Sequence, residues 1–91
     1  MQRATPQGGF AIRYPERARK RGESGVTLVA ATIGADGRCL SAEVERSSGY
    51  SELDAAALAA VRGARFSPAR EGGVAVAARD RFEIVFELHR R

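Results

Sequence analysis

The C-terminal part of the chain alternates apolar and charged side chains, and this alternation constrains the fold more than any other feature of the sequence. Four apolar residues occupy every second position from Phe82 to Leu88, and Val85 alone interrupts the charged residues between them. Successive side chains of a β-strand point to opposite faces of a sheet, so the pattern predicts a strand with one face in a core and one in water. We expect this strand to begin near Val74.

Two further strands precede it, separated by a tight turn. Residues 26–33 are all apolar or threonine, and β-branched side chains dominate. The pair Asp36-Gly37 then tolerates the positive φ angles of a hairpin turn. The second strand is predicted over residues 39–46, where apolar and polar side chains alternate. Its core face is predicted to hold Leu40, Ala42 and Val44.

Helical patterns occur before the first strand and between the second and the third. Pro15 suits the first position of a helix, and a short helix is predicted from there to Arg21, ending at Gly22. Ser51 is predicted to cap a longer helix over residues 52–64, whose apolar side chains recur at spacings of three and four. The predicted core residues are Leu53, Leu58, Val61 and Phe66. The order helix, strand, strand, helix, strand predicts an α+β fold with two helices on one face of a three-stranded antiparallel sheet.

The size of the chain allows one small core. It has 91 residues, and 44% of its side chains are apolar. We predict a flexible linker over residues 1–11, where a proline and two glycines stand among polar residues, and one domain over residues 12–91. The longest uncharged run, residues 24–35, is shorter than the ~20 apolar residues of a membrane-spanning helix.

The residue types that most enzymes and metal sites need are scarce. Cys39 is the only cysteine, which excludes an intramolecular disulfide and a cysteine-based zinc site. A nucleophile paired with a base would need the single histidine, His89, which lies close to the end of the chain. Gly72-Gly73 lacks the spacing and the following lysine of a phosphate-binding loop. We therefore predict no enzymatic activity, no metal site and no cofactor.

Positive charge is concentrated around the first predicted helix. Five basic residues lie between Arg13 and Arg21 against Glu16 alone, which gives this stretch a net charge of +4. Such a cluster attracts phosphates, anionic lipid headgroups or acidic protein surfaces. Sheets that bind RNA usually present aromatic side chains outward, whereas Phe82 and Phe86 share the core register here. We therefore expect no nucleic-acid partner, although nucleic-acid binding is the alternative class to test.

The predicted last strand lies at an edge of the sheet. Its unpaired N–H and C=O groups can accept a strand from a partner, and each backbone hydrogen bond contributes ~0.5–1.5 kcal/mol. The second interpretation is an edge that is only protected by charge. The charged residues concerned are Arg79, Asp80, Arg81, Glu83 and Glu87. The residue pattern favours neither interpretation over the other.

A series of short motifs, each weak alone, becomes specific through its order and spacing. The motifs are Tyr14-Pro15, Gly25-Val26, Asp36-Gly37-Arg38, Val44 with Ser47-Ser48-Gly49-Tyr50, Leu53-Asp54 with Ala57, Arg65-Phe66-Ser67-Pro68-Ala69 and Phe86-Glu87-Leu88. Over residues 12–88, the chain resembles the TonB C-terminal domain family. The resemblance implies two helices on a three-stranded sheet, the same fold that the residue pattern predicts.

The resemblance also implies a function. Proteins of this family are anchored in the bacterial inner membrane, associate with a proton-driven motor complex and reach across the periplasm. Their C-terminal domain binds the TonB box, a short N-terminal segment of outer-membrane receptors, and so powers the uptake of iron siderophores, cobalamin or similar cargo. Alternatives of similar shape are a TolA-like domain, or a sensor or secretion protein that uses the domain only to bind other proteins.

The partner-binding residues of the family can be carried onto matching positions of this chain. The final strand would pair with the receptor segment, and the stretch before the first helix would flank the added strand. Arg17 would meet acidic groups of the receptor, while the basic cluster steers the approach. An exposed edge strand also favours a homodimer. The implied partner-binding residues are Ile12, Arg13, Tyr14, Pro15, Arg17, Arg79, Asp80, Arg81, Phe82, Glu83, Ile84, Val85, Phe86 and Glu87.

Overall fold

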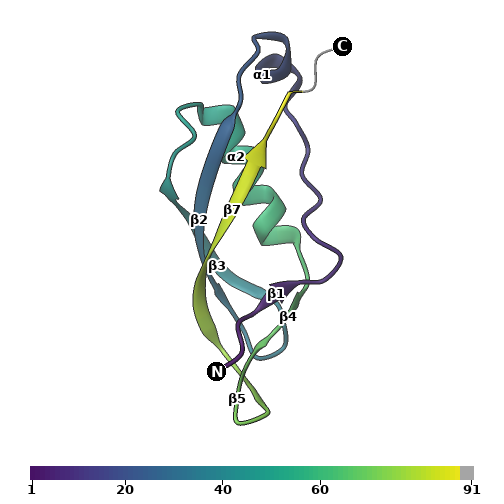
Figure 1. Ribbon diagram of the computed structural model, residues 1–91, viewed down its shortest axis with the longest axis vertical. Coiled ribbons are helices and arrows are strands. Elements are labelled where there is room, and N and C mark those ends of the chain that lie inside the picture. The colour runs from purple at the N-terminus through teal and green to yellow at the C-terminus, as the bar shows by residue number, and fades with distance from the viewer. Residues whose placement is uncertain (89–91) are drawn as a thin grey trace.

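Three long antiparallel strands form the sheet of the domain in the computed structural model, which describes residues 1–88 (Figure 1). They are β2 (Gly25–Ile33), β3 (Cys39–Arg46) and β7 (Ala78–Phe86). β2 lies in the centre, and its pairing with β7 runs from Gly25 opposite Phe86 to Ile33 opposite Ala78. β3 and β7 are therefore the two edges of this sheet.

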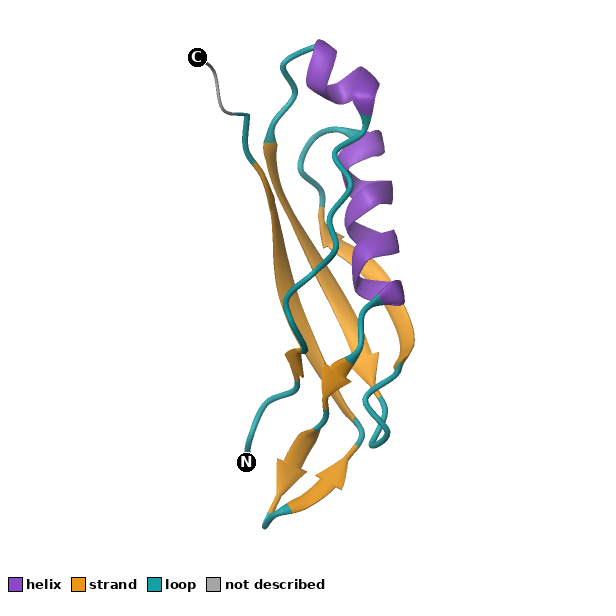
Figure 2. Cartoon of the chain, turned by 90° about the vertical axis from the view of Figure 1, so that its right-hand side faces the viewer, coloured by secondary structure: helices purple, strands orange, loops and turns teal. Residues whose placement is uncertain are grey.

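Both helices lie on the same side of the sheet (Figure 2). α1 (Glu16–Lys20) is shorter than predicted, and α2 (Ser51–Gly63) packs against β2 and β3. The predicted α+β class, with two helices on one face of a three-stranded antiparallel sheet, is confirmed. In residues 1–88 no helix combines the length and the apolar character that crossing a bilayer requires.

The core lies between the helices and the sheet face that they cover. Alternate residues of β2 and β7 point into it, and α2 contributes side chains spaced by three and four residues. The largest buried side chains include Val29, Ile33, Leu53, Val61, Phe66, Phe82, Ile84 and Phe86. Full burial of one such side chain contributes ~1.5–3 kcal/mol. Leu58, also predicted to be in the core, is half-buried against this cluster.

Two pairs of short strands extend the domain beyond the main sheet. β1 (Thr5–Pro6) pairs with β4 (Phe66–Ser67), and β5 (Ala69–Glu71) forms a hairpin with β6 (Val74–Val76). The prediction that the last strand begins near Val74 is wrong. The chain turns at Gly72 and Gly73 and pairs β6 with β5, and Ala77 then separates β6 from β7.

The N-terminal segment predicted to be a linker packs against the domain in the structure. Ala4 is 3% exposed, and its neighbours in β1 pair with β4. The backbones of Gln2 and Arg70 exchange two hydrogen bonds, of 2.8 and 2.9 Å. Backbone polar groups need hydrogen-bond partners when they are buried, and here β4 and β5 supply them. The boundary expected between residues 11 and 12 has no counterpart in the packing, and the predicted domain end at Arg91 lies outside the described residues.

A bulge in β3 changes which of its side chains face the core. Ile33 of β2 pairs with Cys39, but the preceding residue Thr32 pairs with Ser41, so Leu40 is the additional residue of the bulge. Leu40 is consequently 64% exposed, and its prediction as a core residue is wrong. Cys39 packs against the core in its place. Ala42 packs against the core as predicted, and Val44 is half-buried.

The start of α2 also differs from the prediction. Tyr50 occupies the N-cap position, and no side chain makes a capping hydrogen bond there. The predicted cap by Ser51 is therefore wrong, because Ser51 is already the first helical residue. The carboxylate of Asp54, in the first turn, instead binds groups of the preceding loop.

Candidate functional site

The outer side of β7 is an exposed sheet edge. β2 pairs with one side of β7, and no strand of residues 1–88 pairs with the other. In an antiparallel pair, residues alternate between hydrogen bonding to the partner strand and facing away from it. The N–H of Arg81 donates to the Asp80 carboxylate and its C=O accepts from Arg3, so Arg81 faces away from β2. By the alternation, Glu83 and Val85 face away as well, and we call their outward N–H and C=O groups the free edge.

The two faces of β7 present different side chains. Phe82, Ile84 and Phe86 point into the core and are at most 7% exposed. Arg79, Arg81, Glu83 and Val85 lie on the face that no helix covers, and all four are exposed. Arg79 forms an ion pair with Glu43 of β3, and Arg81 forms one with Glu45. A partner at this edge would therefore contact the backbone and the exposed side chains, because the three aromatic and aliphatic core residues are not accessible.

An extended segment from Phe10 to Pro15 runs beside β7 on the helix side (Figures 1 and 2). The Phe10 ring meets the Phe82 ring edge-on with centroids 5.7 Å apart, and the Tyr14 ring meets the Phe86 ring in the same way at 5.4 Å. The two rings are four positions apart in each segment, so the segment keeps in step with β7. The Tyr14 hydroxyl donates to the backbone carbonyl of Glu23, which holds the segment against the start of β2. Ile12, between the two rings, is 41% exposed.

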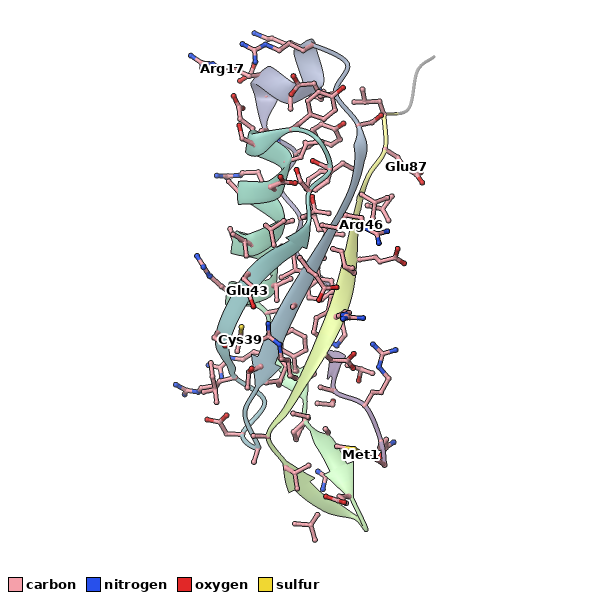
Figure 3. The ribbon with its side chains drawn as sticks, turned by 90° about the vertical axis from the view of Figure 1, so that its left-hand side faces the viewer. Met1, Arg17, Cys39, Glu43, Arg46 and Glu87 are labelled. Atoms are coloured by element: carbon pink, nitrogen blue, oxygen red, sulfur yellow. The ribbon has the colours of Figure 1, made fainter. Side chains whose placement is uncertain are left out.

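The basic cluster lies at the end of the molecule where β7 finishes. Figure 3 shows Arg17 on α1 and Glu87 after β7 at this same end. Arg13 and Arg17 are exposed, and Lys20 forms a 3.4 Å ion pair with Glu16. A cavity of about 550 Å³ separates the end of α1 from the end of β7. Its lining comprises Tyr14, Arg19, Lys20, Arg21, Gly22, Glu87 and Leu88.

At the opposite end of β7, Arg3 binds the Asp80 carboxylate through two hydrogen bonds. Nε lies 2.6 Å from Oδ2 and Nη2 lies 2.9 Å from Oδ1. Burial alone would raise the pKa of the Asp80 carboxyl, but hydrogen bonds from Arg3 and the Arg81 N–H, together with both positive charges, outweigh it and hold the pKa below its usual value. The hydrogen bond to Asp80 and its charge raise the pKa of Arg3. Sequence reasoning did not include Arg3, because its partner is 77 residues away along the chain.

The structure brings most of the implied partner-binding residues together around β7. Ile12 and Tyr14 lie in the segment beside β7, and Arg17 lies on α1 at the end where β7 finishes. Arg13 and Pro15 instead line a pocket against α2. Sequence reasoning missed Phe10, which lies in the segment predicted to be a linker. A lone phenylalanine after two glycines was the available signal for it.

Groups suited to chemistry are few in the part of the chain that the structure describes. Among residues 1–88, no three His, Cys, Asp or Glu side chains converge as metal ligands would. Burial raises the pKa of the Cys39 thiol, against smaller opposite effects of the Arg62 charge and of a backbone hydrogen bond with Ser41. A raised pKa disfavours the nucleophilic thiolate. His89, considered above as a base, lies outside the described residues.

Comparisons with known proteins identify the family. The family model for the Gram-negative bacterial TonB protein C-terminal domain matches residues 11–88. The TonB protein of Vibrio cholerae is 40% identical over 76 residues, which make up 84% of this chain and 31% of that protein. The solution NMR structure of the Pseudomonas aeruginosa TonB C-terminal domain has a TM-score of 0.78 and 30% identity, and the match covers 97% of this chain and 89% of that one. The chain thus spans about a third of the length of its curated relative. From the matched sequence and the shared fold together, we conclude that this chain belongs to the Gram-negative TonB C-terminal domain family.

Proposed function

We propose that this domain is the receptor-binding part of a TonB-type energy transducer and works in the periplasm. It binds the TonB box of an outer-membrane receptor as an additional strand on β7. The observation that carries the proposal is the free edge at Glu83 and Val85, which lies beside the ordered segment Phe10–Pro15. Membership of the TonB C-terminal domain family supports the same role.

Strand addition suits a partner segment that must be bound along its whole length. Backbone hydrogen bonds hold an added strand largely irrespective of its sequence, and alternate side chains supply the selectivity. On one side the added strand would meet Ile12 and Tyr14, and on the other it would meet the exposed Val85 and Glu83. An apolar side chain of the partner next to Ile12 and a polar one next to Glu83 would suit these surroundings.

The basic cluster has a separate role in this proposal. Arg13 and Arg17 are exposed, and Arg17 lies on α1 at the end where β7 finishes, so these side chains can attract acidic groups of the receptor. Exposed charges of this kind raise the rate of association more than the final affinity, and salt screens them. The strand then provides most of the affinity.

The remaining features of a transducer belong to the rest of the protein. In this proposal, the domain is part of a protein anchored in the inner membrane, where a motor complex uses the proton-motive force. Force applied through the domain to the TonB box opens the receptor for siderophore-bound iron, cobalamin or similar cargo. The domain itself catalyses no reaction and binds no cofactor. Two copies paired through β7 would form a homodimer that competes with the receptor for the same edge.

An NMR titration of the isotope-labelled chain with synthetic TonB-box peptides tests the proposal. We expect chemical-shift changes at Glu83, Val85 and residues 10–15 at low and at high salt. A response at high salt distinguishes backbone pairing from binding through charge alone. Should no peptide cause such shifts, while an oligonucleotide causes salt-sensitive shifts confined to residues 13–21, nucleic-acid binding would replace this proposal. A TolA-like role would instead require binding to other periplasmic proteins and none to these peptides.

A further inference from the structure

The N-terminal segment covers one end of the β7 edge. β1 pairs with β4 after Arg3, and Gln2 pairs with Arg70 before it, so the backbone is held on both sides of Arg3. From this position the guanidinium binds both oxygens of the Asp80 carboxylate. It also donates to the backbone C=O of Arg81, at 3.3 Å.

Asp80 completes this cover. Its Oδ1 accepts the N–H of Arg81 at 2.8 Å. Arg3 donates a hydrogen bond to the C=O of Arg81, and Asp80 accepts one from its N–H. Both backbone groups that Arg81 would offer to an added strand therefore already have partners. Glu83 and Val85 face the same side of β7, and within residues 1–88 no hydrogen bond beyond the sheet engages their backbones.

The Arg3–Asp80 pair is built to persist. A guanidinium bound to both oxygens of a carboxylate is stronger and more directional than a single contact between charges. The Asp80 side chain is 24% exposed and the Arg3 side chain is 68% exposed, so solvent partly screens the charges, and the bidentate geometry does more than the charges to keep the pair together. The anchoring of β1 also reduces the freedom that Arg3 would gain on release.

We infer that the Arg3–Asp80 pair sets the end of the strand-addition site, so that a partner strand is held opposite Glu83 and Val85 and stops before Arg81. This inference rests on the proposed function and adds to it the position and the length of the bound segment. A strand that pairs with both residues covers on the order of five residues of β7, in the half nearest α1. Arg3 and Asp80 thus act as positioning residues, although neither contacts the bound segment.

Amide hydrogen exchange of the full 91-residue chain, with and without a synthetic TonB-box peptide, tests the inference. In the wild type, the peptide should slow exchange at Glu83 and Val85 and leave Arg81 unchanged. In Asp80→Ala, the N–H of Arg81 loses its partner, and Arg3 loses the carboxylate that positions it beside the C=O of Arg81. The peptide should then slow exchange at Arg81 as well, and it should bind about tenfold more tightly because up to two more hydrogen bonds can form.

Two further variants make the test specific. Arg3→Gln frees only the C=O of Arg81, so we expect a smaller gain in affinity of about threefold. Arg38→Gln is the matched control, because it removes the same charge from an exposed 3.8 Å ion pair with Asp36, next to the opposite edge of the sheet. It should leave both the affinity and the exchange pattern as in the wild type.

The outcomes separate this inference from the function on which it rests. The inferred end of the binding site would be wrong if the peptide protected Arg81 in the wild type, or if Asp80→Ala and Arg3→Gln both bound the peptide with wild-type affinity. Strand addition to β7 would still stand in either case. Absence of peptide binding to β7 in the wild type would overturn the proposed function and this inference with it.

Discussion

Thr27, in the central strand, donates a 2.8 Å hydrogen bond to Asp54, in the first turn of α2. The Thr27 side chain is fully buried, so its hydroxyl has no water to bind in place of the carboxylate. Asp54 also accepts hydrogen bonds from the hydroxyls of Ser47 and Ser48 and from the Ser48 N–H. One carboxylate therefore joins β2, the loop after β3 and the start of α2, next to the positive end of the helix dipole.

The charge of Asp54 makes this junction sensitive to pH. Burial alone would raise the pKa of Asp54, but the hydrogen bonds from Ser47, Ser48 and Thr27 outweigh it and hold the pKa below its usual value. A carboxyl group whose pKa is lower in the folded chain stabilises the fold above its unfolded pKa, and this contribution is lost as pH falls through the folded pKa. We expect Asp54→Asn to lower the free energy of unfolding by about 2 kcal/mol at pH 7. The difference from wild type should shrink below about pH 4.

Urea unfolding at pH 7 and at pH 3 measures both effects. Glu52→Gln is the control, because Glu52 lies in the same helical turn but takes no part in this network. It should change the free energy of unfolding by less than about 1 kcal/mol. A loss in Asp54→Asn that is equally large at both pH values would mean that Asp54 acts through packing and not through its charge.

Gly37, in the turn between β2 and β3, is required by both its conformation and its surroundings. Its φ is +83°, and a Cβ at this position would lie 2.1 Å from the backbone oxygen of Phe66. The Phe66 N–H also donates to the Gly37 C=O at 2.9 Å, which holds the turn against β4. Gly49 has a φ of +97° but open space around it.

Alanine substitutions at the two glycines should therefore differ. Gly49→Ala introduces only the strain of a positive φ, about 1–2 kcal/mol. Gly37→Ala adds a clash with backbone that cannot rotate away, and we expect a loss of about 3–4 kcal/mol. Thermal unfolding of both variants by circular dichroism measures the difference. Equal losses would show that the turn can move away from β4 at little cost.

The long elements of this fold follow from the sequence because each has a period of its own. β2, β3 and α2 match their predicted ranges within one or two residues, since alternation and helical spacing repeat over many positions. Strands of two or three residues, such as β1 and β4, have no such repeat. They exist because distant segments meet, so only the tertiary structure defines them.

The candidate site is less accessible to sequence reasoning than the fold. Alternation placed Phe82 and Glu83 on opposite faces of β7, but it does not say which backbone groups face β2 and which face outward. The direction of these groups depends on the register between the strands. In the structure, the hydrogen bonds of the Arg81 backbone to Asp80 and Arg3 reveal it. The bulge at Leu40 escaped prediction for the same reason, because a single additional residue leaves no mark on the pattern.

Phe10 ties the N-terminal segment to the core. Its ring meets Phe66 and Phe82 edge-on, with centroids 5.9 and 5.7 Å away. We expect Phe10→Ala to lower the free energy of unfolding by about 2–3 kcal/mol, because two aromatic contacts and a half-buried ring are lost. Ile12→Ala, two residues along and 41% exposed, should cost less than about 1 kcal/mol. If urea unfolding gives the wild-type free energy of unfolding for both variants, the segment adds nothing to stability and behaves as a linker.

Two ion pairs cross the uncovered face of the sheet above Ala30. Arg79 with Glu43, and Arg81 with Glu45 at 2.8 Å, link β7 to β3 over the central strand. Ala30 lies beneath them and is 2% exposed although no helix covers that face. The long side chains thus shield the small residue, in part through their apolar stems.

The strength of these pairs is expected to be small despite their good geometry. In the pair between Arg81 and Glu45 the side chains are 68% and 35% exposed, so water and salt screen the attraction. A double-mutant cycle of Arg81→Gln and Glu45→Gln should give a coupling free energy of about 0.5 kcal/mol, falling further in 1 M salt. Arg81→Gln should also leave peptide binding unchanged, since the bound segment is expected to stop before Arg81 and the substitution leaves the Arg81 backbone in place. A coupling of several kcal/mol would instead mean that the pairs hold the two edge strands together, and the uncovered face would then contribute to stability as much as the core side does.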